Sequence, residues 1–284
     1  MPVSINWHVW ARCNYRCGFC FATFKGVGAV LPMELALQVP RMLAAAGAQK
    51  ITFAGGEPTL CPYLIDLLKE SKAAGLTTGI VTNGWLLNER FIEKMRPYTD
   101  WIALSIDSAS DEVEASLGRG QGNHVSRARK IAPLIRHSGI HLKINTTVTS
   151  QTWREDMHPL IRELKPERWK VFQVLLIHGE NDAFMIDGGV TREQFEDFVR
   201  RHADLNPVVE DNDAMTGSYV MLDPIGRFFQ NTHGMLEVSD SISDRGVLAA
   251  LDQVGWDKDK FVSRGGLYDW KRPDDGRGAS KSPK

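Results

Sequence analysis

Strand-like and helix-like segments alternate along most of this 284-residue sequence. Apolar runs that suit buried strands lie at residues 3–10, 50–54, 77–82, 101–106, 140–148 and 169–177. Stretches with apolar residues at helical spacing separate these runs. Such alternation predicts a parallel sheet covered by helices. Because six units of this kind are too few to close an eight-stranded barrel, we expect an α/β fold with an open sheet, a partial (β/α)6 barrel.

The pattern changes near residue 206. Residues 219–222 and 227–229 predict a hairpin, and the sequence beyond them is rich in loops. We therefore predict a barrel core over residues 1–205 and a loop-rich C-terminal extension over 206–271 that closes the site. The tail 272–284 is polar and poor in bulky residues, so we expect it to be disordered.

The bulk composition excludes several classes of partner. A formal charge of −1 gives no general attraction to nucleic acid or to an anionic membrane, so we expect neither as a partner. No apolar stretch is long enough to span a bilayer. The first ten residues lack the basic and apolar regions of a signal peptide. These features predict a cytoplasmic protein that starts directly with its first strand.

Cys13, Cys17 and Cys20 follow the first predicted strand with the spacing C-x3-C-x2-C. Three thiolates in one short loop can hold three irons of a [4Fe–4S] cluster and leave the fourth iron open to a small molecule. Structural zinc is the alternative, but it needs four ligands, and Cys61 lies far along the chain before a proline. Disulfides are disfavoured because the chain has no secretion signal. We therefore predict that Cys61 is not a ligand.

The ends of the next predicted strands carry polar or glycine-rich motifs. In barrel-like α/β folds, chemistry collects at the C-terminal ends of the strands. Glycines there let the backbone approach a ligand closely, and a glutamate can accept from a positive amino group. Turn formation or helix capping is the alternative role for the polar residues. The expected cofactor-binding residues at these ends are Gly55, Gly56, Glu57, Asn83, Ser105 and Asp107.

Several cations are predicted to form a local anion site. Lys143 and Asn145 alternate on the fifth strand and so share a face. Lys170 lies early in the apolar sixth strand, where a buried charge must be paired. A carboxylate partner or exposure at an edge is the alternative for this lysine. We expect Lys143, Lys170, Arg119 and Arg264 to converge on a polyphosphate.

Nine segments together resemble the viperin family of radical S-adenosylmethionine (SAM) nucleotide dehydratases. They occur in order between about residues 6 and 270: CNYRCGFCF, GGEP, GRGQG, NHV, KIN, RWKVFQ, LLIHGEN, SYVMLD and RGG. The resemblance implies a [4Fe–4S] cluster whose open iron is chelated by the amino and carboxylate groups of SAM. It also implies that Phe19 packs near the adenine and that the segment ending in Glu57 holds the SAM ammonium.

The same resemblance implies the reaction. A ribonucleoside triphosphate, with CTP or UTP favoured, would become its 3′-deoxy-3′,4′-didehydro form by abstraction of the 4′-hydrogen and loss of the 3′-hydroxyl. This product would terminate RNA chains and act against viruses or phage. One further electron and proton are required, and Tyr219 is the candidate donor. The alternative for Tyr219 is a packed tyrosine with a bonded hydroxyl. We expect a reductant such as flavodoxin or ferredoxin as a partner.

Two other readings remain open. A nucleotide cyclase of the radical SAM type would also take a nucleoside triphosphate, but it would need cysteines for a second cluster. A non-catalytic metal-binding protein would use the cysteine loop for structure alone. Within the family, Asp240 and Leu267 replace lysines, which leaves the base unsettled. His141 shares a strand face with Lys143, so either it reads the base or it lies exposed at the start of the strand.

Overall fold

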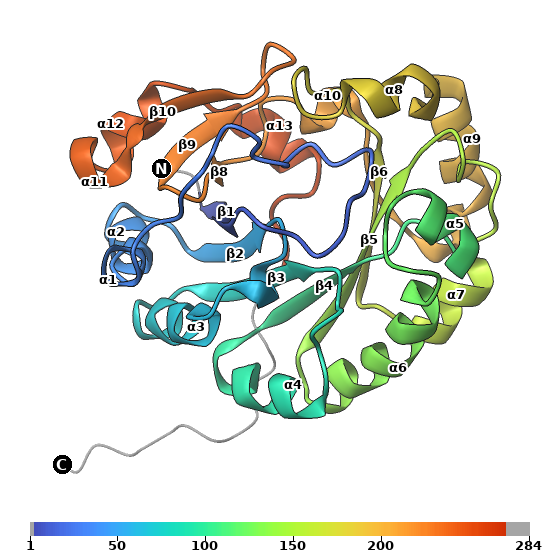
Figure 1. Ribbon diagram of the computed structural model, residues 1–284, viewed down its shortest axis with the longest axis horizontal. Coiled ribbons are helices and arrows are strands. Elements are labelled where there is room, and N and C mark those ends of the chain that lie inside the picture. Colours follow the sequence, from blue (N-terminus) through green and yellow to red (C-terminus); the bar gives the residue numbers. More distant parts are fainter. Residues whose placement is uncertain (1–2, 271–284) are drawn as a thin grey trace.

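The computed structural model describes residues 3–270, so the predicted tail 272–284 lies outside the described residues. One ten-stranded sheet runs through this part of the chain in the order β10-β9-β8-β1-β2-β3-β4-β5-β6-β7 (Figure 1). The strands from β1 to β7 pair in parallel, each with the next. They are β1 (Ser4–Trp10), β2 (Lys50–Gly55), β3 (Thr77–Thr82), β4 (Trp101–Ser105), β5 (His141–Val148), β6 (Arg168–Gln173) and β7 (Val208–Glu210).

Helices cover the outer face of this curved sheet (Figure 1). They are α1 (Met33–Ala36), α2 (Val39–Ala45), α3 (Leu64–Ala73), α4 (Glu89–Met95), α5 (Asp111–Ser116), α6 (His124–His137), α7 (His158–Leu164) and α9 (Arg192–Arg201). A further helix, α8 (Asp182–Gly188), instead packs its Phe184 against Phe19 of the cysteine loop. The α/β fold predicted from the alternating pattern is confirmed, and the sheet is open.

Each parallel strand presents two different faces, as β5 illustrates. Leu142, Ile144 and Val148 are fully buried on the helix-covered side, where their apolar surface is removed from water. Lys143 and Asn145 alternate with them and line a cavity on the inner side. The period of two along a strand therefore separates the core from the site.

The C-terminal part continues the same sheet. β7 is a seventh parallel strand that the sequence did not reveal, because its three residues are too short to show a period. The predicted hairpin is confirmed by β8 (Met221–Leu222) and β9 (Arg227–Gln230), and β10 (Glu237–Ser241) adds to it. β8 also pairs in parallel with β1, so the extension is attached to the first strand of the barrel.

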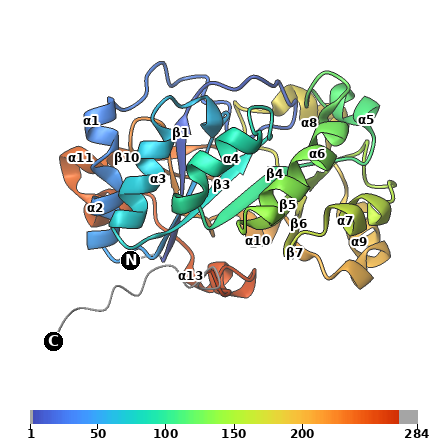
Figure 2. The same ribbon diagram turned by 90° about the horizontal axis from the view of Figure 1, so that it is seen from below.

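Four short helices complete the described chain: α10 (Asn212–Met215), α11 (Ile242–Arg245), α12 (Val247–Asp252) and α13 (Lys258–Ser263). Figure 2 shows α13 on the side of the molecule where β1 begins, opposite α5 and α8. Among residues 3–270, no helix has the length and apolar character required to cross a bilayer.

Candidate active site

A cavity of about 1460 Å³ lies on the inner side of the sheet. Every residue that the sequence predicted for the site lines it, except His141. These residues are Cys13, Cys17, Phe19, Cys20, Gly55, Gly56, Glu57, Asn83, Ser105, Asp107, Arg119, Lys143, Asn145, Lys170, Tyr219 and Arg264. The fold thus brings together side chains from six strands and their loops.

The cavity has two chemically different ends. The cysteine loop follows the C-terminal end of β1. Five cations from the first residues of strands and from the chain after α13 line the other end: Lys50, Lys143, Arg168, Lys170 and Arg264. We call these five residues the cation cluster. Since the strands are parallel, a residue near the start of any strand lies toward the cations. A residue near the end of a strand lies toward the thiols.

Two glycine segments hold the cysteine loop by close backbone contacts. The Gly56 N–H donates to the Trp10 carbonyl at 2.6 Å, and a Cβ at Gly56 would lie 2.4 Å from the Arg12 carbonyl oxygen. On the other side, the Arg16 N–H donates to the Gly118 carbonyl at 3.0 Å. Gly118 has a φ of +83°, and its Cβ would lie 2.1 Å from Arg16 O. Glycine is required at both positions because any side chain would push the loop away.

The three thiols of this loop fit a metal cluster. Cys13, Cys17 and Cys20 are half-buried and make no disulfide. Burial raises the pKa of Cys17 to about 12 and also raises those of Cys13 and Cys20. Bound metal would stabilise the thiolates that burial disfavours. Cys61, in contrast, is 4% exposed within the apolar core, so it cannot join them.

The number of thiols in the loop argues against a structural zinc ion. Such an ion is almost always held by four ligands in a tetrahedral arrangement. The loop supplies three thiols, while Cys61 is buried in the apolar core. Three thiols fit a cluster in which each cysteine binds a different iron.

Glu57 joins two neighbouring strands through its buried carboxylate. Its carboxylate accepts from the Thr59 N–H at 3.0 Å, the Thr82 hydroxyl at 2.6 Å and the Asn83 N–H at 2.8 Å. The side chain is 1% exposed. The carboxylate therefore ties the end of β2 to the end of β3. Glu57 also lines the cavity, and its contact with an amino group of the cofactor stays a prediction.

Asn83 then contacts the cysteine loop. Its amide nitrogen donates to Asn14 Oδ1 at 2.8 Å and lies 3.9 Å from the Cys13 sulfur. Ser105, at the end of β4, uses its carbonyl to bind the His124 ring at 2.8 Å. Asn83 and Ser105 both line the cavity.

Arg119 also belongs to the thiol end. Its Nε donates to Asp107 Oδ2 at 2.5 Å and lies 3.5 Å from Glu114 Oε2. The guanidinium lies 5.5 Å from the centre of the Phe19 ring. Burial, together with the nearby Asp107, raises the pKa of Glu114 to about 8. Two buried carboxyl groups therefore hold Arg119 beside the cysteine loop, and its convergence with the lysines on a polyphosphate stays a prediction.

The cation cluster is short of negative charge. Lys170 and Arg264 share Glu210, which is fully buried, with an Arg264-to-Glu210 distance of 3.1 Å. Lys50, Lys143 and Arg168 make no ion pair within 4.0 Å with any residue from 3 to 270. Burial and the neighbouring cations lower the pKa of Lys50 to about 7. A bound anion would remove this repulsion.

Lys50 and Arg168 were missed in the sequence. Each is the first residue of a strand, where a cation usually reaches solvent, so no local signal set them apart. The pairing of Lys143 with Arg168 across β5 and β6 could have indicated a shared face, once the two strands were known to be neighbours.

Residues 264–270 close this end of the cavity. The Tyr268 hydroxyl accepts from both Lys50 and Lys143, the latter at 2.8 Å. Arg168 donates to the Gly265 carbonyl at 2.7 Å and lies 4.1 Å from the centre of the Tyr268 ring. Since hydroxyl and carbonyl groups carry no full charge, they satisfy hydrogen bonds without neutralising the cations.

Tyr219 contacts two members of the cation cluster and their shared carboxylate. Its hydroxyl donates to Glu210, accepts from Lys170 at 2.8 Å, and its ring lies 3.6 Å from the Arg264 guanidinium carbon. Burial raises the pKa of Tyr219 well above its ordinary value, so the phenol keeps its proton. The bonded hydroxyl weighed in the sequence is present, and the residue also lines the cavity.

His141 does not read a base in this cavity. Its ring stacks on Trp101 at 4.5 Å with an interplanar angle of 26°, and its Nδ1 lies 3.6 Å from Glu167. Trp101 lines the cavity, while His141 is absent from the lining. The hypothesis that His141 selects the base is therefore wrong, since the tryptophan takes the inner position.

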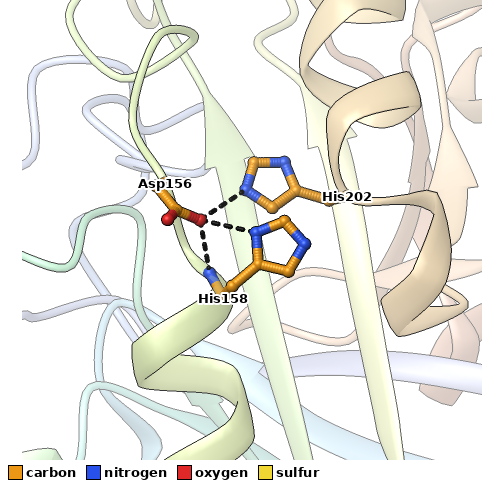
Figure 3. A group of neighbouring side chains, drawn as sticks. All are labelled: Asp156, His158 and His202. Atoms are coloured by element: carbon orange, nitrogen blue, oxygen red, sulfur yellow. Dashed lines mark hydrogen bonds and ion pairs between the residues drawn. The ribbon is translucent and has the colours of Figure 1, made fainter.

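The group of Asp156, His158 and His202 lies away from the cavity, at the start of α7 (Figure 3). Both ring nitrogens of His202 are engaged, one with the Phe198 carbonyl at 2.8 Å and one with the Met157 N–H at 3.0 Å. The His158 and His202 rings stack at 4.7 Å, so their lone pairs do not point to one centre. The group is an ion-pair cluster rather than a metal site.

Comparison with known proteins places this geometry in a family. Residues 7–201 match the radical SAM superfamily. An S-adenosylmethionine-dependent nucleotide dehydratase from Flammeovirga pacifica is 42% identical over 278 residues, which cover 94% of this chain and 96% of the relative. One from Danio rerio is 38% identical over 290 residues, covering 96% of this chain and 79% of the relative.

A solved structure supports the fold alone. Streptococcus suis SuiB bound to S-adenosylmethionine superposes with a TM-score of 0.63 at 18% identity. The match covers 80% of this chain and 59% of the SuiB chain.

Replacing the loop cysteines tests the cluster ligands. We expect Cys13→Ala, Cys17→Ala and Cys20→Ala each to lose bound iron and its visible absorbance after anaerobic reconstitution, because each thiol serves a separate iron. Cys61→Ala is the matched control and should keep its iron content. Iron retained by Cys17→Ala, or lost from Cys61→Ala, would contradict the assignment.

His158 predicts a dependence of stability on pH. Hydrogen bonds to Asp204, at 2.7 Å, and to Asp156 raise the folded-state pKa of His158 above its ordinary value of about 6.5. Its stabilising contribution is therefore full below pH ~6.5 and is lost as the pH rises through the raised pKa. We expect His158→Ala to lower the free energy of unfolding, by up to about 1 kcal/mol, more at pH 5.5 than at pH 9.

Urea unfolding at the two pH values measures this difference. His137→Ala is the matched control, because His137 is exposed on α6 and bonds only a backbone carbonyl. A deficit for His158→Ala that is equal at both pH values would show that the ion pairs contribute nothing.

Proposed function

The chain belongs to the S-adenosylmethionine-dependent nucleotide dehydratases of the radical SAM superfamily, the viperin family, and from this premise we propose its substrate and product. The substrate is a ribonucleoside triphosphate, with CTP or UTP favoured. The product is the 3′-deoxy-3′,4′-didehydro nucleotide. The observation that carries the proposal is one cavity with three thiols at one end and five cations at the other.

The cofactors of the family fit the thiol end. Cys13, Cys17 and Cys20 would hold the cluster, and the backbone of residues 55–57, Asn83 and Ser105 would face SAM. When bound, these cofactors supply a 5′-deoxyadenosyl radical that takes the 4′-hydrogen of the ribose. An external one-electron donor such as flavodoxin or ferredoxin would supply electrons to the cofactors at the thiol end.

The register of β5 and β6 orients the nucleotide. Lys143 lies opposite Arg168, and one step nearer the thiols Asn145 lies opposite Lys170. The phosphates would therefore lie deepest, among Lys143, Arg168 and Lys50, and Arg264 would complete the anion site. The ribose would lie between Asn145 and Lys170, with its 4′-carbon toward the thiols. The Asn145 Oδ1, buried and without a hydrogen-bond partner, is suited to a ribose hydroxyl.

The enclosed position serves the chemistry. A carbon radical must be kept from water and from other hydrogen donors, and reaction requires its target to be held close. Residues 264–270 close the cation end around the phosphates. Once the 4′-hydrogen is gone, the 3′-hydroxyl leaves as water, and one electron and one proton complete the product. A nucleotide without a 3′-hydroxyl cannot be extended, so we propose an antiviral or antiphage role.

Incubation with the four ribonucleoside triphosphates tests this function. The reconstituted protein, with SAM and dithionite under anaerobic conditions, should convert CTP or UTP to a product lighter by one water and form 5′-deoxyadenosine. Mass spectrometry and proton NMR of the ribose identify the product. Formation of 5′-deoxyadenosine with no dehydrated nucleotide from any of the four would refute the proposal.

Lys143 should contribute to nucleotide affinity. Its ammonium bonds the Tyr268 hydroxyl and pairs with no carboxylate among residues 3–270, so it is available to a phosphate. A charge-assisted contact contributes roughly 1.5–3 kcal/mol, so Lys143→Ala should raise the KM for the nucleotide about ten- to a hundredfold. The KM for SAM should change far less.

Lys130→Ala, which removes an exposed lysine from α6, is the matched control and should leave both KM values unchanged. If Lys143→Ala weakens SAM and nucleotide equally, the lysine supports the fold rather than the phosphate.

A further inference from the structure

We propose that Glu210 accepts the phenolic proton of Tyr219 when this tyrosine gives an electron to the nucleotide, and that Lys170 delivers a proton to the departing 3′-hydroxyl. The inference rests on the proposed dehydration and specifies how its last electron and proton are supplied. Three side chains from two separate parts of the chain carry it.

Glu210 is the centre of a buried network. It is the last residue of β7 and is fully buried. One carboxylate oxygen contacts both Lys170 and Arg264, and the other accepts from the Tyr219 hydroxyl. Burial alone would raise the pKa of Glu210, but the two cations hold it below its ordinary value. The carboxylate is therefore ionised and ready to receive a proton.

The directions of the hydrogen bonds show that Tyr219 would give its proton and its electron to different acceptors. A phenol has one proton, and that of Tyr219 points to Glu210. The phenol oxygen accepts from Lys170 at 2.8 Å. Tyr219 therefore presents no O–H to the cavity. It can give an electron to the nucleotide across the cavity, while its proton moves in another direction, to the carboxylate.

Lys170 is the group that can protonate the leaving hydroxyl. An ammonium has three N–H donors, and two are used by Tyr219 and Glu210. Lys170 lines the cavity at the level of Asn145, where the ribose is placed, so the third N–H faces the substrate. Burial lowers the pKa of Lys170 to about 8, which suits an acid working near neutral pH.

The step balances as follows. The Lys170 ammonium gives a proton to the 3′-hydroxyl of the 4′-radical, the C3′–O bond breaks, and water leaves a radical cation on the sugar. Tyr219 gives one electron, which forms the C3′=C4′ bond, and its proton passes to Glu210. Protonated Glu210 returns a proton to the neutral amine of Lys170. An external one-electron reductant and a solvent proton then restore the tyrosine.

Arg264 keeps this network in place. Its guanidinium stacks on the Tyr219 ring at 3.6 Å and also donates to Glu210. A cation over the ring restrains the phenol while its hydroxyl stays on the carboxylate. The arginine therefore acts through the tyrosine and the glutamate, as a positioning residue for the electron donor.

Glu210→Gln tests the relay, because the amide keeps the shape but cannot take up the proton. The full reconstituted enzyme is assayed with dithionite, SAM and saturating nucleotide, and both products are counted. We expect the wild-type protein to form about one dehydrated nucleotide for each 5′-deoxyadenosine. Glu210→Gln and Tyr219→Phe should still form 5′-deoxyadenosine, but the ratio should fall at least tenfold. Glu210→Asp, which retains a carboxylate, should recover most of the ratio.

Two controls separate the relay from a structural role. Lys130→Ala removes an exposed lysine of α6 that does not line the cavity, so it should keep the ratio near one. Calorimetry on the metal-free protein should show that Glu210→Gln binds the triphosphate at least as tightly as the wild type, since a negative charge has been removed beside the phosphates.

An unchanged product ratio in Glu210→Gln would overturn the relay. So would weaker nucleotide binding together with a proportional loss of both products, which would mean that Glu210 only shapes the site. These results differ from failure of the proposed function, in which the wild-type protein itself forms no dehydrated nucleotide.

Discussion

Five clustered cations with only one carboxylate among them are the constraint on which the inner side of this protein depends. Burial disfavours the charges of Lys50, Lys143 and Lys170, and the neighbouring cations repel them, so the cation cluster is costly until an anion enters. Tyr268 and the Gly265 carbonyl satisfy hydrogen bonds without supplying charge. The binding energy of a triphosphate would therefore include relief of this repulsion, and the chain after α13 closes over the same groups.

The parallel register connects this anion site to the thiols. Lysine and asparagine two residues apart on β5 lie at successive depths in the cavity, each opposite a cation of β6. At the other end, the cysteine loop is fixed by Gly56 and Gly118 and not by its own hydrogen bonds alone. A shift of one residue in either strand would turn the polar side chains toward the helices. Register thus sets both which groups meet and how far apart they are.

The main strands and the cysteine loop could be predicted because each produces a local pattern in the sequence. Alternation revealed the six main strands, and cysteine spacing revealed the loop of thiols. The part that could not be predicted depends on which side chains become partners. Glu57 is used by Thr59, Thr82 and Asn83, and Arg119 by buried carboxyl groups, which no spacing in the sequence shows. β7 and its Glu210 were missed because three residues carry no period.

An open sheet explains why the site can extend along the whole inner side. In a closed eight-stranded barrel, layers of inward side chains fill the interior, and chemistry is confined to the C-terminal rim. Here the inward positions of the middle strands are small, with Ala54, Gly79 and Ala103 lining the cavity. Large residues at these places would separate the thiols from the cations. The open edge is filled by β8, which pairs with β1, so Tyr219 from the C-terminal part reaches Lys170 and Glu210 inside the barrel. Hence the strand that encloses the cavity is also adjacent to the residue proposed to supply the last electron.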